Sequence, residues 1–263
     1  MEDRQKIYQV VRDIARQAGD RIRRHFFSSD KINAQPKGPN DFVTRVDRES
    51  ESLITSTLQQ HFPGIPSLAE ETKRRPSHRP EYLWVIDPLD GTTNFLQKIP
   101  HFGISIALLH RNTPVFGLVY HPLLDETFHA FAGEGSYLNR ERIAVSAKGN
   151  LSDCVGSTGF PFRSQHQIKA YLAAFRAIFT RSRGMRRCGA AVLDLAYLAC
   201  GRYDYFWEAY LEPWDFLAGA ILIQEAGGTI TDFHQQPLGP SPSDVLAAPP
   251  QIYHQILPHL QAF

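Results

Sequence analysis

The sequence contains little cysteine and no long apolar run. Its three cysteines are widely spaced without a C-x-x-C pair, and they are Cys154, Cys188 and Cys200. This set is typical of reduced thiols in a cytosolic protein rather than of a disulfide framework. The apolar stretches, such as residues 104–109, are too short to span a bilayer, and no signal-peptide core follows the charged start. We therefore expect a cytoplasmic protein with no membrane partner.

The sequence also lacks an excess of charge of either sign. Lysine and arginine number 28 and aspartate and glutamate 27 among 263 residues, so the net charge is +1. This balance excludes a highly charged disordered chain and gives no support for bulk nucleic-acid binding. A nucleic-acid or transcription-machinery partner stays open, but composition does not favour it. The 43% hydrophobic and 21% charged residues are typical of a globular protein.

Apolar periodicity predicts a helical start, a strand-rich middle and an alternating second half. We expect helices over residues 3–27 and from a cap at Asp47 to about residue 61, with a loop or hairpin around Pro36 between them. The other expected helices cover 167–181, 190–200, 215–226 and about 250–261, and the expected strands cover 65–69, 83–86, 104–109, 115–120, 127–131, 203–207, 229–233 and 244–247. This order predicts an α/β protein with layered helices and mixed sheets, forming one compact domain over residues 1–263.

The segment IDPLDGTTN, residues 86–94, is the most informative for chemistry. A buried strand brings Asp87 to its end, and Asp90 follows three residues later, so both carboxylates can point into one cleft. Gly91 and the threonines after it can present backbone N–H groups at a helix start, where phosphate binds readily. Because each of these residues also favours turns, the segment alone is equally compatible with a plain turn.

Two more acidic positions add to this pattern. Glu70 and Glu71 end another expected strand, and Asp215 opens a helix that stops at Gly227. The alternatives are a solvated rim for the glutamates and a helix cap for Asp215. Carboxylates that converge in one pocket raise one another's pKa unless cations neutralise them. A ligand set of oxygens, without histidine or cysteine, favours Mg²⁺ or a similar hard ion over Zn²⁺.

Together these motifs resemble the inositol monophosphatase family. The resemblance rests on WVIDPLDGTTNF at 84–95, PWD at 213–215 and EAGG at 225–228, and it extends from DFVTRVD at 41–47 to Asp232. Residues 158–162 and 194–197 look most like the bacterial branch. The resemblance implies an α/β/α/β/α sandwich of the sugar-phosphatase type and a homodimer. It also implies lithium-sensitive hydrolysis of myo-inositol monophosphates by a water that Mg²⁺ activates.

The resemblance also assigns roles to matched positions. Its metal ligands, for two or three Mg²⁺ ions, are Glu70, Asp87, the backbone carbonyl of Leu89, Asp90 and Asp215. The residues implied to activate the water are Glu70, Thr92 and Asp47. The substrate-binding residues are Asp90, Gly91, Thr92, Ala191, Glu208 and Asp215, and Lys37 belongs to a mobile loop near the metals.

Three departures from the family pattern bear on the site. Ala69 alters the turn before the glutamates, Pro39 stiffens the Lys37 loop, and Glu212 adds negative charge near the expected pocket mouth. None removes an implied metal ligand. The alternative functions are fructose-1,6-bisphosphatase or broader sugar-phosphatase activity, and a regulatory or RNA-associated role on the same scaffold.

The remaining candidates are expected to be structural. The eleven histidines show no metal-ligand spacing, so we expect surface or core positions for them. We expect the three cysteines to be buried and inert. A basic cluster is expected to form a solvated face or a dimer contact rather than an RNA site, and it consists of Arg181, Arg183, Arg186 and Arg187.

Overall fold

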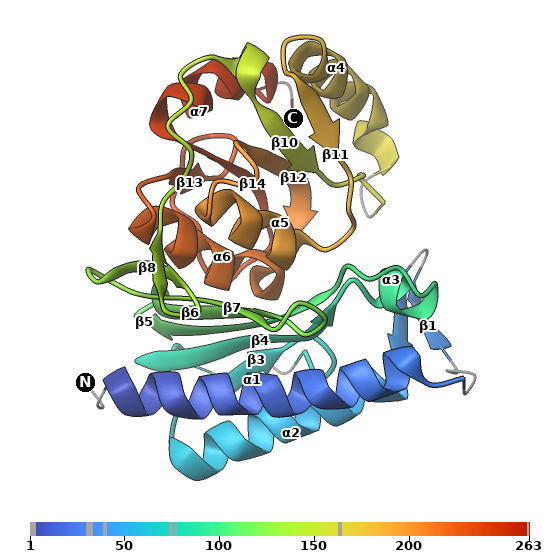
Figure 1. The fold of residues 1–263 in the computed structure, drawn as a ribbon, viewed down its shortest axis with the longest axis vertical. Helices are drawn as coiled ribbons and strands as arrows, with labels where there is room; N and C mark the ends of the chain where they lie inside the picture. Colours follow the sequence, from blue (N-terminus) through green and yellow to red (C-terminus); the bar gives the residue numbers. More distant parts are fainter. Residues whose placement is uncertain are drawn as a thin grey trace.

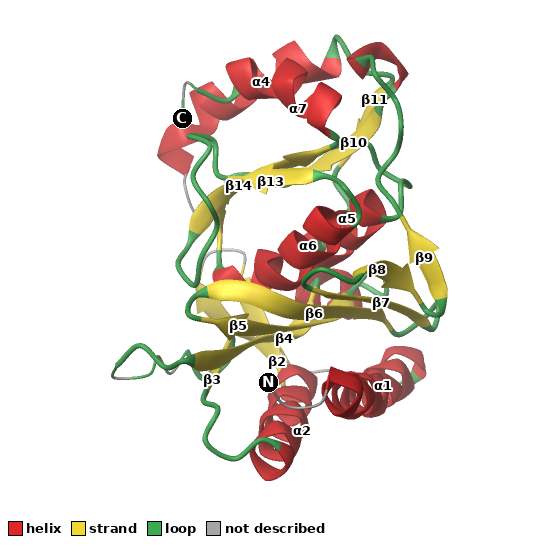
Figure 2. Ribbon diagram, turned by 90° about the vertical axis from the view of Figure 1, so that its left-hand side faces the viewer, coloured by secondary structure: helices red, strands yellow, loops and turns green. Residues whose placement is uncertain are grey.

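The computed structural model describes residues 4–29, 34–38, 41–73, 76, 78–162, 165–261 and 263. Within these residues, helices and sheets stack in five layers (Figure 1, Figure 2). A helix pair covers a seven-stranded sheet, a second pair separates that sheet from a five-stranded one, and further helices cover the outer face. This α/β/α/β/α order confirms the fold predicted from the sequence.

The first layer consists of α1 (Arg4–Phe27) and α2 (Arg45–His61). The buried residues of α1 recur every three or four positions, which places one apolar stripe against the sheet. The expected hairpin precedes α2 and consists of β1 (Ala34–Gly38) and β2 (Asp41–Thr44). The predicted cap at Asp47 is wrong, because Thr44 is the N-cap and its hydroxyl accepts the Val46 N–H at 3.0 Å. Asp47 is instead the third helical residue, and its carboxylate accepts the Thr44 N–H at 2.9 Å.

The seven-stranded sheet brings the acidic motif into the centre of the molecule. Its spatial order follows the sequence: β3 (Ser67–Ala69), β4 (Tyr82–Asp90), β5 (Gly103–His110), β6 (Thr113–His121), β7 (Glu126–Phe131), β8 (Gly135–Leu138) and β9 (Glu141–Ile143). Only the β3–β4 pair is parallel among the pairs described in this sheet. Helices cover both faces, so β4 is buried along almost its whole length.

A bulge in β4 places its two aspartates on one face of the sheet. Asp87 pairs with Ser105 and Asp90 with Gly103, so β4 carries one residue more than β5 between these pairs. Leu83 and Val85 pack in the core on the α6 side, whereas Trp84 and Ile86 pack in the core on the α1 side. Strict alternation would turn Asp87 and Asp90 to opposite faces, and the extra residue brings them to the same face.

The second half of the chain forms a mixed five-stranded sheet that packs against two buried helices. Its order is β11 (Gly184–Arg186), β10 (Val155–Thr158), β12 (Phe206–Leu211), β14 (Ser243–Ala248) and β13 (Thr229–Thr231). Between the sheets lie α5 (Ala191–Ala199) and α6 (Pro213–Glu225). Residues 213–223 of α6 are all buried, as expected for a helix packed between two sheets. The outer layer holds α4 (Ile168–Phe179) and α7 (Pro250–Ile256).

Several sequence-based predictions in the second half need correction. The strand expected at 203–207 is β12 at 206–211, because Asp204 is buried as an acceptor for the Val155 N–H at 2.7 Å. The last helix ends at Ile256 and continues only as a short 3-10 helix over Leu257–His259. Four short strands were not predicted, namely β8, β9, β10 and β11.

The cysteines differ in exposure. All three cysteines are free, but only Cys154 is buried, so the expectation that all three are buried is wrong. Cys188 and Cys200 are half-buried. In the described ranges, no helix is both long and apolar enough to cross a membrane.

Candidate active site

A cavity of about 340 Å³ lies where the ends of β3 and β4 meet α3 (Thr92–Leu96), α5, α6 and β12. Nine of the residues predicted for the site line it: Glu70, Asp87, Leu89, Asp90, Gly91, Thr92, Ala191, Glu208 and Asp215. Asp47 lies directly behind Thr92. The side chain of Lys37 falls outside the described residues, although its backbone forms part of β1. The structure therefore brings together the acidic positions that the sequence separates widely.

Backbone N–H groups hold the two aspartates of β4. Asp87 is 1% exposed, and its Oδ1 accepts the Leu89 N–H at 2.9 Å. Asp90 Oδ2 accepts the Val192 N–H at 2.9 Å, which joins the end of β4 to the start of α5. Both carboxylates therefore have fixed positions before any ligand binds.

Asp215 reaches the cavity from the start of α6. It is the third residue of this helix rather than its cap, and its Oδ2 accepts the Glu212 N–H at 2.9 Å. Ser105 Oγ donates to the Trp214 carbonyl at 3.0 Å and ties this helix start to β5, beside Asp87. Glu212 lies between Leu211 and Asp215, which both line the cavity, so the charge expected near the mouth stays a prediction. Its backbone positions Asp215.

Burial, together with neighbouring negative charge, disfavours the ionisation of the two aspartates of β4. Burial raises the pKa of Asp87 well above its usual range, and the negative charges of Glu70 and Asp90 raise it further. Burial also raises the pKa of Asp90 to about 8, although the Val192 N–H partly offsets this effect. Such a cluster is stable in its ionised form only when a cation neutralises it. Oxygen donors from several carboxylates fit a hard divalent cation.

Thr92 and Asp47 form a hydrogen-bonded pair at the cavity wall. Thr92 Oγ1 lies 2.9 Å from Asp47 Oδ1 and 3.1 Å from the Leu89 carbonyl oxygen. Asp47 is fully buried, and burial raises its pKa. Because both neighbours of the hydroxyl are acceptors, the hydroxyl donates its hydrogen to one of them. Its lone pairs are then free to accept a hydrogen bond from a molecule inside the cavity.

Glu70 stands at the end of β3, and the turn after it is fixed by a glutamate that the sequence analysis missed. Glu51 is 3% exposed, and its carboxylate accepts the Glu71 N–H at 2.7 Å and the Thr72 N–H at 3.1 Å. The sequence does contain an indication that Glu51 is buried. It precedes Ile54 by three residues and Leu58 by seven, and it therefore lies on the apolar stripe of α2. Ala69, the departure noted in the sequence, is buried in the core under this turn.

Gly91 connects β4 to α3 in a conformation that requires glycine. Its φ is +89°, in the left-handed region, and an added Cβ would lie 3.0 Å from the His101 carbonyl oxygen. The helix after it has no side-chain cap. A side chain at position 91 would therefore strain the turn and push apart the segments that form the cavity.

The wall opposite the aspartates comes from β12 and the segment after β10. Gly159 lies against Glu208, since an added Cβ would be 1.8 Å from Glu208 Oε1. At the rim, the Arg187 guanidinium lies 5.0 Å from the ring centres of both Phe160 and Phe162. The expected basic cluster is exposed, but Arg187 also lines the cavity, which the sequence analysis did not predict.

The sequence model of the inositol monophosphatase family matches residues 3–262. The chain belongs to the inositol monophosphatase family. It is 41% identical to the Nus factor SuhB of Salmonella typhimurium over 219 residues, which cover 83% of this chain and 82% of that protein. This result confirms the family predicted from the sequence motifs.

Solved structures of family members show the same fold. The extragenic suppressor protein suhB of Bartonella henselae superimposes with a TM-score of 0.90 at 36% identity, covering 97% of this chain and 98% of that one. An inositol monophosphatase from Anabaena gives a TM-score of 0.86 at 34% identity, covering 98% and 96%. The layered fold of this family member is therefore shared along nearly its full length.

Proposed function

We propose that this family member is a Mg²⁺-dependent phosphomonoesterase that hydrolyses myo-inositol monophosphates. The observation that carries the proposal is the convergence of four carboxylates on one cavity, beside the Thr92–Asp47 pair. These carboxylates belong to Glu70, Asp87, Asp90 and Asp215. Family membership supports a phosphate-ester substrate, and the similar Anabaena protein carries the name inositol monophosphatase.

The proposal assigns the metal ligands in two groups. Glu70, Asp87 and the Leu89 carbonyl would hold one ion, and a weaker third ion would bind near Glu70. Asp87 would share the second ion with Asp90 and Asp215. Bound Mg²⁺ would lower the pKa of the attacking water and would neutralise negative charge on the leaving oxygen. The raised pKa values of Asp87 and Asp90 support this assignment, because a cation at these carboxylates restores their ionised form.

The chain's own residues position the water and the substrate. Thr92 Oγ1, with its hydrogen directed toward Asp47, accepts a hydrogen bond from the attacking water, and Glu70 is the base that takes the water's proton. The backbone N–H groups of Gly91 and Thr92 bind the phosphate oxygens. Glu208 accepts hydrogen bonds from the hydroxyls of the sugar alcohol, and Ala191 contacts its ring.

A phosphate-release assay with Mg²⁺ tests the proposal. The substrates are myo-inositol 1-phosphate, fructose 1,6-bisphosphate, adenosine 3′,5′-bisphosphate and histidinol phosphate. We expect the highest kcat/KM for the inositol phosphate and inhibition by Li⁺. A preference for fructose 1,6-bisphosphate would replace the proposed substrate by the alternative sugar-phosphatase activity. Release from none of the four substrates would contradict the enzymatic function itself.

Glu208→Ala is expected to reduce kcat/KM for myo-inositol 1-phosphate by about 10- to 100-fold, because the ring hydroxyls lose a charged hydrogen-bond acceptor. The loss for fructose 1,6-bisphosphate should be smaller. Gly159→Ala tests the same contact from the other side, since its Cβ displaces the Glu208 carboxylate. Gly239→Ala is a matched control, because an added Cβ there has no neighbour within 4 Å. Equal losses on both substrates would remove Glu208 from substrate selection.

We also propose that the protein is a homodimer with two-fold symmetry, the commonest arrangement of oligomers. The proposal rests on the family resemblance. Light scattering at micromolar concentration is expected to give about twice the monomer mass. A monomer mass across that range would contradict it.

A transcription-associated role is a second candidate, and the observation that favours it is the name Nus factor given to similar proteins. If this role exists in the present chain, it should be separable from catalysis. Asp90→Asn should then bind RNA polymerase of the source organism as well as the parent does in a pull-down with purified components. Absence of binding by the parent would reject this candidate.

A further inference from the structure

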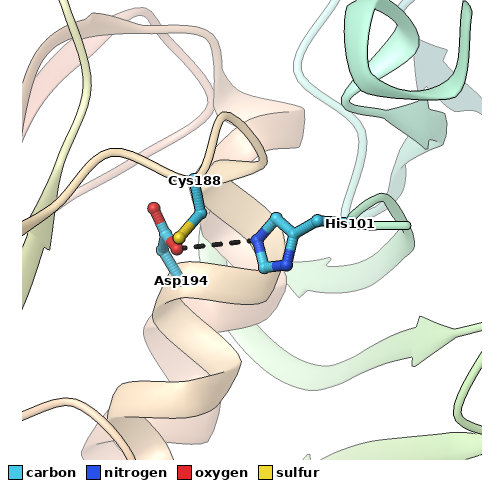
Figure 3. A group of neighbouring side chains, drawn as sticks. All are labelled: His101, Cys188 and Asp194. Carbon is cyan, nitrogen blue, oxygen red and sulfur yellow. Dashed lines mark ion pairs between the residues drawn. The ribbon is translucent and has the colours of Figure 1, made fainter. Parts of the chain in front are cut away.

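Three side chains with different donor atoms meet next to one another (Figure 3), and one of them, Asp194, also lines the cavity described above. His101 lies between α3 and β5, Cys188 precedes α5, and Asp194 lies on α5. One ligand atom from each of them falls within 4.8 Å of the other two. This cluster was not predictable from local pattern, because 87 positions separate His101 from Cys188.

Two of the three ligand atoms are buried without a hydrogen-bond partner in the described part of the chain. These atoms are His101 Nε2 and Asp194 Oδ1, which lie 3.8 Å apart. That separation is too long for a hydrogen bond. The contact is an ion pair, drawn as the dashed line in Figure 3, and not a hydrogen bond. The Asp194 side chain is only 2% exposed, so leaving its oxygen without a hydrogen bond is costly. Cys188 Sγ lies within hydrogen-bonding distance of the Tyr203 hydroxyl, at 3.3 Å.

The backbone around the cluster is already held in place. The Asn94 side-chain amide donates to the His101 carbonyl at 2.7 Å and to the Cys188 carbonyl at 2.8 Å. One amide therefore clamps two of the three ligand residues together. Asp194 stands on α5, which is buried between the two sheets. The backbone of these residues therefore needs little additional ordering when a ligand binds, which favours a high affinity.

We propose that His101, Cys188 and Asp194 form a second metal site, selective for Zn²⁺ or a similar transition-metal ion. A nitrogen, a sulfur and an oxygen donor suit Zn²⁺, whereas the oxygen-only carboxylate cluster suits a hard ion. With Zn–N and Zn–O distances of about 2.0–2.2 Å, the 3.8 Å separation needs to close by only a few tenths of an ångström. On binding, Cys188 releases its thiol proton to solvent, and water takes the fourth position.

Co²⁺ is the probe, because its absorption reports both geometry and ligands. The purified protein, saturated with Mg²⁺ to occupy the carboxylate cluster, is titrated with Co²⁺. A tetrahedral site with a thiolate gives intense visible bands and a sulfur-to-metal charge-transfer band in the near ultraviolet. Binding to carboxylates and water alone gives only weak octahedral bands. We expect the thiolate signal at one equivalent, and Zn²⁺ should remove it by displacing Co²⁺.

Substitutions show which residues produce the Co²⁺ charge-transfer band. Cys188→Ser should abolish the charge-transfer band, and the matched control Cys200→Ser, at another half-buried cysteine, should retain it. His101→Asn should weaken Zn²⁺ binding by more than the roughly 10- to 100-fold lost with an outer-shell partner. Asp90→Asn should leave the signal unchanged, which distinguishes this site from the carboxylate cluster. A band that survives Cys188→Ser would overturn the proposal.

A measurement on the unsubstituted protein covers the case in which a variant misfolds. Zn²⁺ should slow alkylation of Cys188 by about tenfold or more, as peptide mapping after a timed exposure to iodoacetamide would show. Cys200 in the same sample is the internal control and should react at an unchanged rate. Equal alkylation of Cys188 with and without Zn²⁺ would overturn the site.

Discussion

Asp90→Asn is expected to fold, to lose about 1,000-fold or more in kcat and to melt at a higher temperature than the parent when divalent cations are removed. The substitution keeps the size of the side chain, and the asparagine Oδ1 can still accept the Val192 N–H. It removes one negative charge from the metal ligands, which weakens transition-state stabilisation by about 4 kcal/mol or more. The same substitution removes a carboxyl whose raised pKa destabilises the metal-free fold at pH values above its ordinary pKa of 3.8, so the two effects have opposite signs.

The experiment compares kcat in Mg²⁺ with the melting temperature in chelator for each variant. Asp153→Asn makes the same chemical change at an exposed aspartate of the 3-10 helix Leu151–Asp153 and should alter neither quantity. An Asp90→Asn protein with near-parental kcat would show that Asp90 is only a turn residue. If Asp90→Asn melted at a lower temperature than the parent in chelator, the Asp90 carboxyl would not destabilise the metal-free fold.

The metal-free protein is expected to lose stability as the pH rises from about 4 to about 8. Asp90 has an ordinary pKa of 3.8, and burial raises it to about 8 in the folded chain. An acid with a raised folded pKa binds its proton more tightly in the folded state. Its stabilising contribution is therefore complete below the unfolded pKa and is lost as the pH passes through the folded pKa. Asp87 contributes in the same direction.

Added Mg²⁺ should reverse this loss, because it binds the ionised carboxylates of the folded chain. At about 100 times Kd, one site adds about 2.7 kcal/mol of stability, or about 5–10 °C in melting temperature for a chain of this size. The shift should be larger at about pH 8 than at about pH 6, since protons and Mg²⁺ compete for the same oxygens. Melting curves across this range, with and without Mg²⁺, check the prediction. The prediction would be contradicted if the melting temperatures of the parent and of Asp90→Asn changed equally with pH and with added Mg²⁺.

Features encoded by local pattern were predictable from the sequence. The stripe of α1, the buried run before Asp87 and the turn chemistry of residues 86–94 each depend on neighbours within a few positions. The resemblance of the motifs to a known family then predicted the order of the helix and sheet layers. The β4 bulge was not visible, although it determines that Asp87 and Asp90 share a face, because a bulge depends on pairing with β5.

The missed features depend on contacts between distant segments. Glu51 holds the turn after Glu70 across about twenty positions, and Gly159 receives Glu208 from a different strand. The Asp47 cap was misplaced because Thr44, at the end of β2, is also a favoured capping residue and lies three positions earlier. Neither spacing nor composition indicates which residues pair across such distances.

The most direct test of the central claim is the initial rate of phosphate release from myo-inositol 1-phosphate during a Mg²⁺ titration, with parent and Asp90→Asn side by side. If the four carboxylates bind the catalytic cation, the parent rate rises from zero in chelator to a plateau. The Asp90→Asn rate then stays about 1,000-fold lower and needs more Mg²⁺ to approach its own plateau. Parent activity that persists in chelator, or identical Mg²⁺ curves for the two proteins, would contradict the account.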